Sequence, residues 1–156
     1  MVRNILGVIV GYLAMGLFVF ASFSILYMVL KAEGAYKPEV WDLSTTWIIA
    51  SIPIGLVAAV IGGAICRLIS KKRGAVMALA IAVFVLGAAS AAYQLTKDAP
   101  TDPRPEGVSM MDASAKAVQP AWLAIANPII GVIGVGIGGC LLFGSKGDTR
   151  AATDES

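Results

Sequence analysis

The sequence has no histidine and few charged residues, and both absences narrow the functions open to it. Of its 156 residues, 14% are charged and 58% are hydrophobic, whereas a soluble domain carries about 25% charged residues. The composition therefore predicts a membrane protein. Without histidine, the chain lacks the commonest metal ligand and the commonest general base near neutral pH. A net charge of +2 without a basic stripe offers no surface for nucleic acid.

Cysteine is scarce as well, and its placement points to packing. Cys66 and Cys140 are the only two, too few for a structural zinc site. Both fall in apolar, glycine-rich runs near the expected cytoplasmic side, where thiols stay reduced. The chain also shows no acid pair, no serine with a base and no phosphate-binding glycine loop. We therefore expect no metal, no cofactor and no enzymatic activity.

Four long apolar runs dominate what is present. They lie at about residues 4–30, 46–69, 75–95 and 121–143, and each exceeds the roughly 18 residues typical of a membrane span. The first run is also longer than the apolar region of a signal peptide, so we expect it to be retained. The prediction is an all-α integral membrane protein, a four-helix transmembrane bundle formed by one domain over residues 1–156.

Basic residues gather where the second span meets the third, at Arg67, Lys71, Lys72 and Arg73. Cytoplasmic loops carry this bias. We therefore place both termini and the turn at 70–74 in the cytoplasm, and the loops at 31–45 and 96–120 outside. The tail at 144–156 is polar and is expected to be disordered. The predicted location is the inner membrane of a bacterium.

The tryptophans map to the opposite side of the membrane. Trp41, Trp47 and Trp122 all fall near the expected outer boundary. Aromatic residues there commonly form an interfacial belt, so we interpret the three tryptophans, with the four basic residues above, as interfacial anchors. A docking surface for a partner is the alternative interpretation of the outer aromatic residues.

Two segments of the sequence repeat. The stretch from Trp47 to Lys71 and that from Trp122 to Lys146 share an initial Trp, a Pro-Ile pair at the same spacing and a closing Ser-Lys. The first and third apolar runs also match in their second halves. We interpret the chain as two tandem helical hairpins in the same orientation, which predicts a pseudo-two-fold axis along the membrane normal.

Small residues recur at helical spacing in the spans and predict close helix packing. The predicted packing residues are Gly7, Gly11, Gly55, Ala59, Gly62, Gly131, Gly134 and Gly138. In the second outer loop, Ser109 and Asp112 resemble a capping box. There we expect either a short amphipathic helix with Val108 and Met111 on its apolar face, or an irregular loop.

The most unusual feature inside a span is the Asn127-Pro128 pair. A proline frees a backbone carbonyl one turn earlier, and a buried asparagine needs a hydrogen-bond partner. The pair, with Pro53 and Ser51 in the matching span, is a candidate polar intramembrane site. The alternative is an ordinary hydrogen bond between helices beside a tolerated kink. Ile52 occupies the position that matches Asn127.

These features favour a non-catalytic multi-pass membrane protein that acts as an accessory or scaffold subunit. Its expected partners are the lipid bilayer and either another membrane protein or further copies of itself. A small-solute channel or carrier around Asn127 and Pro128 is the second hypothesis. A role in lipid or envelope stress through the outer aromatic loops is a third.

Overall fold

The computed structural model describes residues 2–98, 100–105 and 107–141. Within these residues the chain forms five helices: α1 (Val2–Ala35), α2 (Thr45–Ser70), α3 (Arg73–Thr96), α4 (Met110–Lys116) and α5 (Ala121–Leu141). All except α4 are long and apolar enough to cross a membrane. The all-helical class and the four apolar helices agree with the prediction. The predicted tail lies outside the described residues.

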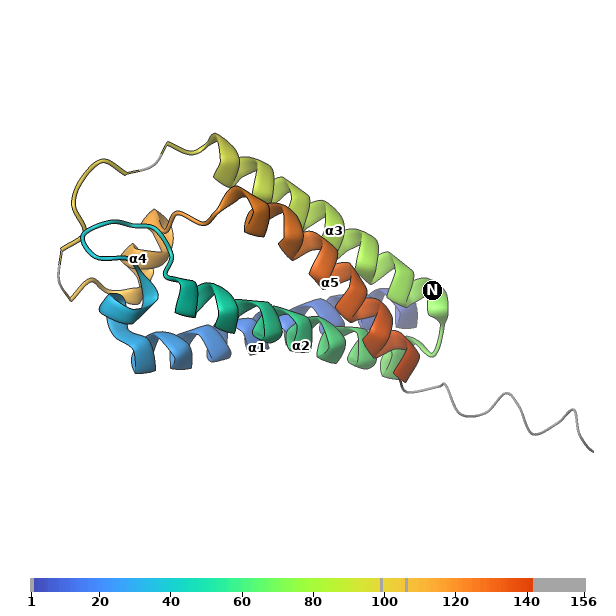
Figure 1. Ribbon diagram of the computed structural model, residues 1–156. Coiled ribbons are helices and arrows are strands. Elements are labelled where there is room, and N and C mark those ends of the chain that lie inside the picture. The colour runs from blue at the N-terminus through green and yellow to red at the C-terminus, as the bar shows by residue number, and fades with distance from the viewer. Residues whose placement is uncertain (1, 99, 106, 142–156) are drawn as a thin grey trace, which may run out of the picture.

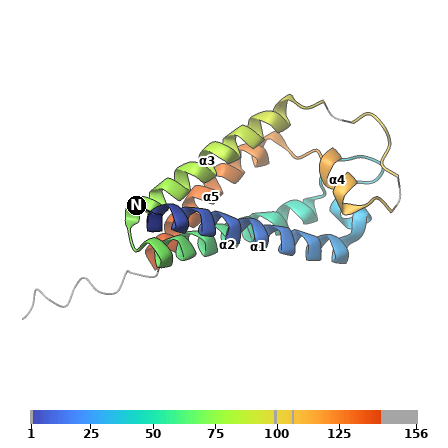
Figure 2. The same cartoon turned by 180° about the vertical axis from the view of Figure 1, so that it is seen from behind.

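The long helices form two antiparallel pairs that meet at one end and separate at the other (Figures 1 and 2). One pair is α1 with α2, and the other is α3 with α5. We call the end that carries the α2–α3 connection the turn end. The opposite end, where α4 and the connecting loops lie over the separated pairs, is the cap end.

At the turn end, hydrogen bonds fix how α2 stops and where α1 starts. Lys71 adopts a left-handed conformation with φ 58°, and its N–H donates to the carbonyl of Arg67 at 2.9 Å. This is a common way to end a helix. The Nε of Arg3 donates to the carbonyl of Ile69 at 2.7 Å. The beginning of α1 is thereby joined to the end of α2.

Glycines let the helix backbones approach closely between the turn end and the middle of the bundle. A Cβ at Gly11 would stand 2.8 Å from the carbonyl oxygen of Gly62. Between α2 and α5, a Cβ at Gly63 would clash with the carbonyl of Val135, and one at Gly138 with the carbonyl of Val60. The surrounding core consists of Ala59, Cys66, Ala75, Leu79 and Val135.

Most of the small residues predicted to pack lie at these contacts. A Cβ would come within 3.0 Å of a neighbouring atom at Gly7, Gly11, Gly62, Gly131, Gly134 and Gly138, and Ala59 is fully buried. Gly55 differs, because a Cβ there would meet no atom within 4 Å. Three further glycines that were not among the predicted packing residues also lie at helix contacts, namely Gly63, Gly87 and Gly139.

At the cap end the two loops hydrogen-bond to each other. The N–H of Leu43 donates to the carbonyl of Val118 at 3.1 Å, and the N–H of Val118 donates to that of Trp41 at 2.9 Å. Ala35, Tyr36, Leu43 and Ala113 form a second buried cluster between them. We call residues 36–44, 100–105 and 107–120 the cap.

Two expectations about these loops change. First, α1 continues past residue 30 to Ala35, with a break at Lys31 where φ is 53°, so the loop at 31–45 is partly helical. Second, α4 forms with Ser109 as its N-cap, and only part of its predicted apolar face is buried, because Val108 packs against the second buried cluster and Met111 does not. Met111 is 81% exposed whereas Ala113 is fully buried, because α4 packs on the cluster of Ala35, Tyr36 and Leu43.

Candidate functional site

Asn127 lies in the half of α5 next to the cap end and lines a cavity of about 170 Å³ between α3 and α5. The other polar residues of this cavity are Ser90 and Gln94 from α3 and Gln119 just before α5. Gly87, Ser90 and Gln94 recur every three or four residues, which puts them on one face of α3. Within the described part of the chain, none of the four polar side chains has a hydrogen bond. The interhelical bond considered for Asn127 is therefore not formed among these residues.

Pro128 has a different role from its neighbour. It is buried, and a Cβ at Gly87 would stand 3.1 Å from its ring. The missing side chain at Gly87 thus lets the proline of α5 pack directly on α3. This contact holds the two helices together beside Asn127, whose side chain stays exposed.

A second cavity, of about 280 Å³, adjoins the first and shares Gln94 and Gln119 with it. Its opposite side is aromatic. Phe23 and Trp47 stack with their ring centroids 5.4 Å apart, and Tyr27 meets Trp47 edge-on at 6.3 Å. The Tyr27 hydroxyl donates to the carbonyl of Val108 at 2.7 Å, which ties this wall to the cap.

We call the two adjoining cavities the vestibule. Its amide wall is formed by Ser90, Gln94, Gln119 and Asn127, and its aromatic wall by Phe23, Tyr27, Tyr36 and Trp47. Met110 and Ser114 of α4 contribute to its roof. Toward the turn end, the close contacts of Gly63 and Gly138 bring α2 against α5. The vestibule therefore does not continue between α2 and α5 at those contacts.

The vestibule carries no formal charge on its lining residues. Burial, and to a smaller extent the neighbouring Tyr27, raise the pKa of Tyr36, while Arg104 lowers it; the resulting pKa is about 12. The phenol is therefore neutral at physiological pH. Among the described residues, no group of three or more His, Cys, Asp or Glu side chains is placed to hold a metal ion.

This arrangement suits an uncharged molecule. Binding pockets typically combine apolar and aromatic walls with a few polar groups that orient the ligand. Here a flat or apolar part of a ligand would lie on the rings, whose large faces contribute most of the contact. Its hydrogen-bonding groups would meet the amides opposite.

The structure separates the four residues of the predicted polar site. Asn127 and Pro128 line the vestibule. Ser51 instead donates to the carbonyl of Ile48 at 2.8 Å within α2, and Pro53 is exposed on that helix. Ser51 and Pro53 are not among the residues that line either cavity.

The predicted interfacial anchors also have different surroundings. Trp122 is 56% exposed, whereas Trp41 is only 4% exposed, and its position inside the cap differs from that of a lipid-facing anchor. Trp47 belongs to the aromatic wall. Lys71, Lys72 and Arg73 are exposed at the turn end, and Arg67 is half-buried there.

Of the four residues of the amide wall, the sequence predicted only Asn127 as part of a site. Ser90 and Gln94 lie near the end of an alanine-rich span, where polar residues usually indicate only that the helix is nearing the membrane surface. The detectable signal was their spacing of four residues, together with Gly87 three residues before Ser90. What joins them to Asn127 and Gln119 is the packing of α3 on α5.

Comparison of this chain with protein-family models, with curated proteins and with solved structures found no match.

Proposed function

We propose that this chain is a non-catalytic membrane protein that binds a small uncharged molecule in the vestibule. The observation that supports this most is that amide side chains without hydrogen bonds and an aromatic wall line two adjoining cavities, which share Gln94 and Gln119. Asn127 and Gln94 are exposed and make no hydrogen bond among the described residues, so their amide groups, with that of Gln119, are available to a ligand. The lining serines have no general base beside them among the lining residues, which favours binding over catalysis.

Entry would be from the cap end, and transport would require the turn end to open. The contacts of Gly63 with Val135 and of Gly138 with Val60 hold α2 and α5 together there. This argues for a carrier or a binding protein and against a permanently open channel. A carrier would have to separate these two helices to release its ligand on the other side.

The proposed setting is the inner membrane of a bacterium, with the cap outside and the turn end in the cytoplasm. The basic residues Arg67, Lys71, Lys72 and Arg73 lie together at the turn end, which is the bias expected of a cytoplasmic surface. A periplasm-active reporter fused after Ser156 tests this. Activity of the reporter outside the cell would overturn the proposed orientation.

We also propose that the two helix pairs are tandem repeats related by a pseudo-two-fold axis. Residues 75 positions apart match in the sequence, so Val60 corresponds to Val135 and Gly63 to Gly138. Gly63 lies against Val135 and Gly138 against Val60. Each contact is thus the counterpart of the other, the relation that a two-fold axis imposes.

The binding proposal is tested by screening uncharged solutes for those that raise the unfolding temperature of the purified protein. Asn127→Leu should abolish the shift that a hit produces. Asn4→Leu makes the same chemical change near the turn end and should leave the shift intact. Equal shifts in wild type and Asn127→Leu would refute the site. Uptake of the hit into liposomes then separates a carrier from a binding protein.

An accessory or scaffold role is the second candidate, and one observation favours it. A Cβ at Gly16 or Gly55 would meet no atom within 4 Å, so these two small residues leave room for another helix to approach. Extraction in a mild detergent followed by size analysis tests this role. A lone monomer would exclude both a stable partner and a homo-oligomer.

A further inference from the structure

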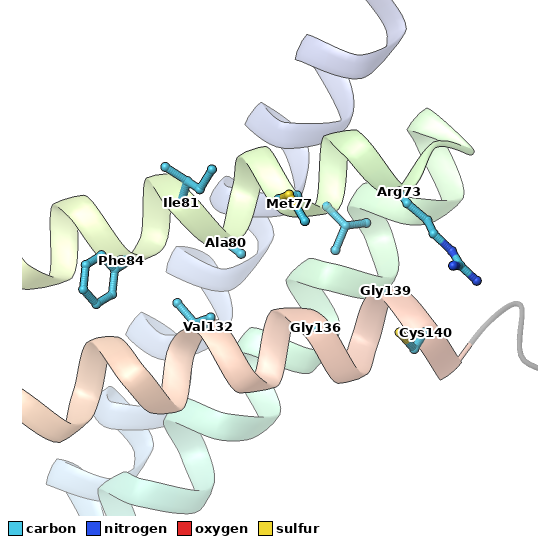
Figure 3. Close-up of a pocket in the computed structure, with 10 residues that line it drawn as sticks. Arg73, Met77, Ala80, Ile81, Phe84, Val132, Gly136, Gly139 and Cys140 are labelled. Carbon is cyan, nitrogen blue, oxygen red and sulfur yellow. The ribbon is translucent and has the colours of Figure 1, made fainter.

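A third cavity lies between α3 and α5 in the half of the bundle next to the turn end (Figure 3). It has a volume of about 500 Å³ and is separate from the vestibule, with which it shares no lining residue. Met77, Ile81 and Phe84 of α3 line one side, and Val132 and Gly136 of α5 line the other. We call it the α3–α5 groove.

Two glycines of α5, Gly136 and Gly139, form part of the floor of the groove. A Cβ at Gly136 would meet no atom within 4 Å, whereas one at Gly139 would meet Val76 at 2.5 Å. Gly139 therefore allows the two helices to approach, and Gly136 leaves the space beside that contact empty. The large side chains that border it are exposed, Met77 by 68% and Ile81 by 58%.

The length of the groove fits one leaflet of a bilayer. Along α3 it extends from Arg73 to Phe84, and at 1.5 Å per residue this corresponds to about 16 Å. The hydrocarbon core of a bilayer is about 30 Å thick, so one leaflet accounts for roughly half of it. An extended acyl chain would therefore lie along the groove without reaching the other leaflet.

One charged residue lines the groove, and it stands at the end where a lipid headgroup would be. Arg73 is the first residue of α3, and its guanidinium has no hydrogen bond or salt bridge to any residue that the structure describes. Lys71 and Lys72 precede it in the turn. The side chain of Lys72, the N-cap of α3, accepts no hydrogen bond from the first turn of the helix. The first N–H groups of α3 therefore add to the positive potential at this end of the groove.

We propose that the α3–α5 groove binds one anionic phospholipid from the leaflet at the turn end. The phosphate lies at Arg73, which presents a fork of donors suited to phosphate oxygens. One acyl chain runs past Met77, Ile81 and Phe84 over the floor at Gly136. Basic sites between membrane helices are known to hold anionic headgroups in this way.

The test uses the purified full chain in mild detergent, equilibrated with equal amounts of phosphatidylglycerol and phosphatidylcholine of identical acyl chains. Native mass spectrometry then counts each retained lipid. The wild type should retain phosphatidylglycerol preferentially. Arg73→Gln should reduce this preference by at least the roughly fivefold effect of one basic residue near an anionic headgroup, because it also removes the fork of donors inside the groove. Lys72→Gln removes the adjacent charge outside the groove and should reduce it much less.

A second pair of variants tests the acyl-chain site. Gly136→Leu fills the empty floor and should abolish retention of the lipid, whereas Gly16→Leu adds the same side chain to an open face of α1 and should not. Equal retention of the two lipids by the wild type would overturn the proposal. So would equal effects of Arg73→Gln and Lys72→Gln, or of Gly136→Leu and Gly16→Leu. Loss of lipid preference leaves solute binding in the vestibule unaffected, so the two proposals fail independently.

Discussion

The indole N–H of Trp41 donates a hydrogen bond of 2.9 Å to the carbonyl of Asp102. This bond joins the loop after α1 to the loop after α3, 61 residues further along the chain. Lys116 lies 5.1 Å from the centre of the same ring, a cation–π distance. The buried side chain of Trp41 is thus one of the groups that join the two loops of the cap.

Trp41→Phe should loosen the cap while leaving the membrane helices folded. Phenylalanine keeps most of the ring but cannot donate the hydrogen bond, which leaves the Asp102 carbonyl without it. We expect a loss of about 1 kcal/mol in the stability of the cap. Hydrogen exchange at Arg104, whose N–H donates to the carbonyl of Glu39 at 3.1 Å, should accelerate accordingly. Trp122→Phe is the control, because the Trp122 ring is 56% exposed and should leave this exchange unchanged.

Gly138→Ala should destabilise the contact between α2 and α5. The added methyl group would clash with the carbonyl of Val60, and overpacking of this kind costs about 1–3 kcal/mol. Gly63→Ala should have a similar effect, because it meets the carbonyl of Val135. Reversible unfolding in mixed micelles measures both.

Gly136→Ala is the matched control for these two variants. It lies on the same helix as Gly138 with no atom within 4 Å of its Cβ, so alanine should be neutral or stabilising by up to about 1 kcal/mol. If all three alanine variants lost stability equally, helix flexibility and not the α2–α5 contact would be the cause.

Alkaline pH should weaken the cap through Tyr36. Burial raises its pKa from 10.0 to about 12. Below pH 10 both the folded and the unfolded chain keep the proton, so this contribution to stability is fully present. Between pH 10 and 12 the unfolded chain releases the proton while the folded chain retains it, and the free energy of unfolding therefore falls.

The measurement for Tyr36 is the unfolding midpoint across that pH window. Tyr36→Phe should show a shallower decline than the wild type, because it has no proton to release. Tyr93→Phe removes a tyrosine that is 67% exposed and should follow the wild-type curve. Parallel curves for wild type and Tyr36→Phe would contradict the prediction.

Ser109→Ala should unravel the start of α4. The Ser109 hydroxyl accepts the N–H of Asp112 at 3.2 Å, and loss of such a cap costs about 1 kcal/mol. We expect faster hydrogen exchange at Asp112 and Ala113. Ser114→Ala in the same helix removes only a bond to the carbonyl of Met111 one turn earlier. If Ser114→Ala accelerated this exchange as much as Ser109→Ala, the N-cap hydrogen bond of Ser109 would not be what stabilises the start of α4.

The prediction of the helices was possible because it depends on local composition. The runs around Gly7 and Asn127 contain too few polar groups to be stable in water, and in a bilayer a backbone must satisfy its hydrogen bonds internally. The N-cap of α4 was likewise predictable, because Ser109 and Asp112 resemble a capping box. The extension of α1 to Ala35 was not, because its last turn is stabilised by contacts with Leu43 and Ala113 in the cap.

The candidate site was predictable only in its most unusual residue. Asn127 is a polar residue in an apolar span, so the sequence alone identified it as a candidate site residue. The residues that line the cavity with Asn127 depend on which helix faces pack together. Gln94 lies near Asn127 because the missing side chain at Gly87 lets Pro128 pack on α3. Ser51 does not line the cavity, and its hydroxyl donates a hydrogen bond within its own helix.

The sequence by itself determined that the chain has four membrane-length apolar helices with glycines at helical spacing along them, because length and composition set these properties locally. The tertiary structure decided that the pairs separate toward the cap end and that Trp41 is buried. It also decided that an amide wall faces an aromatic one. These features depend on where glycines such as Gly63 and Gly138 let backbones touch, and such contacts join residues far apart in the chain.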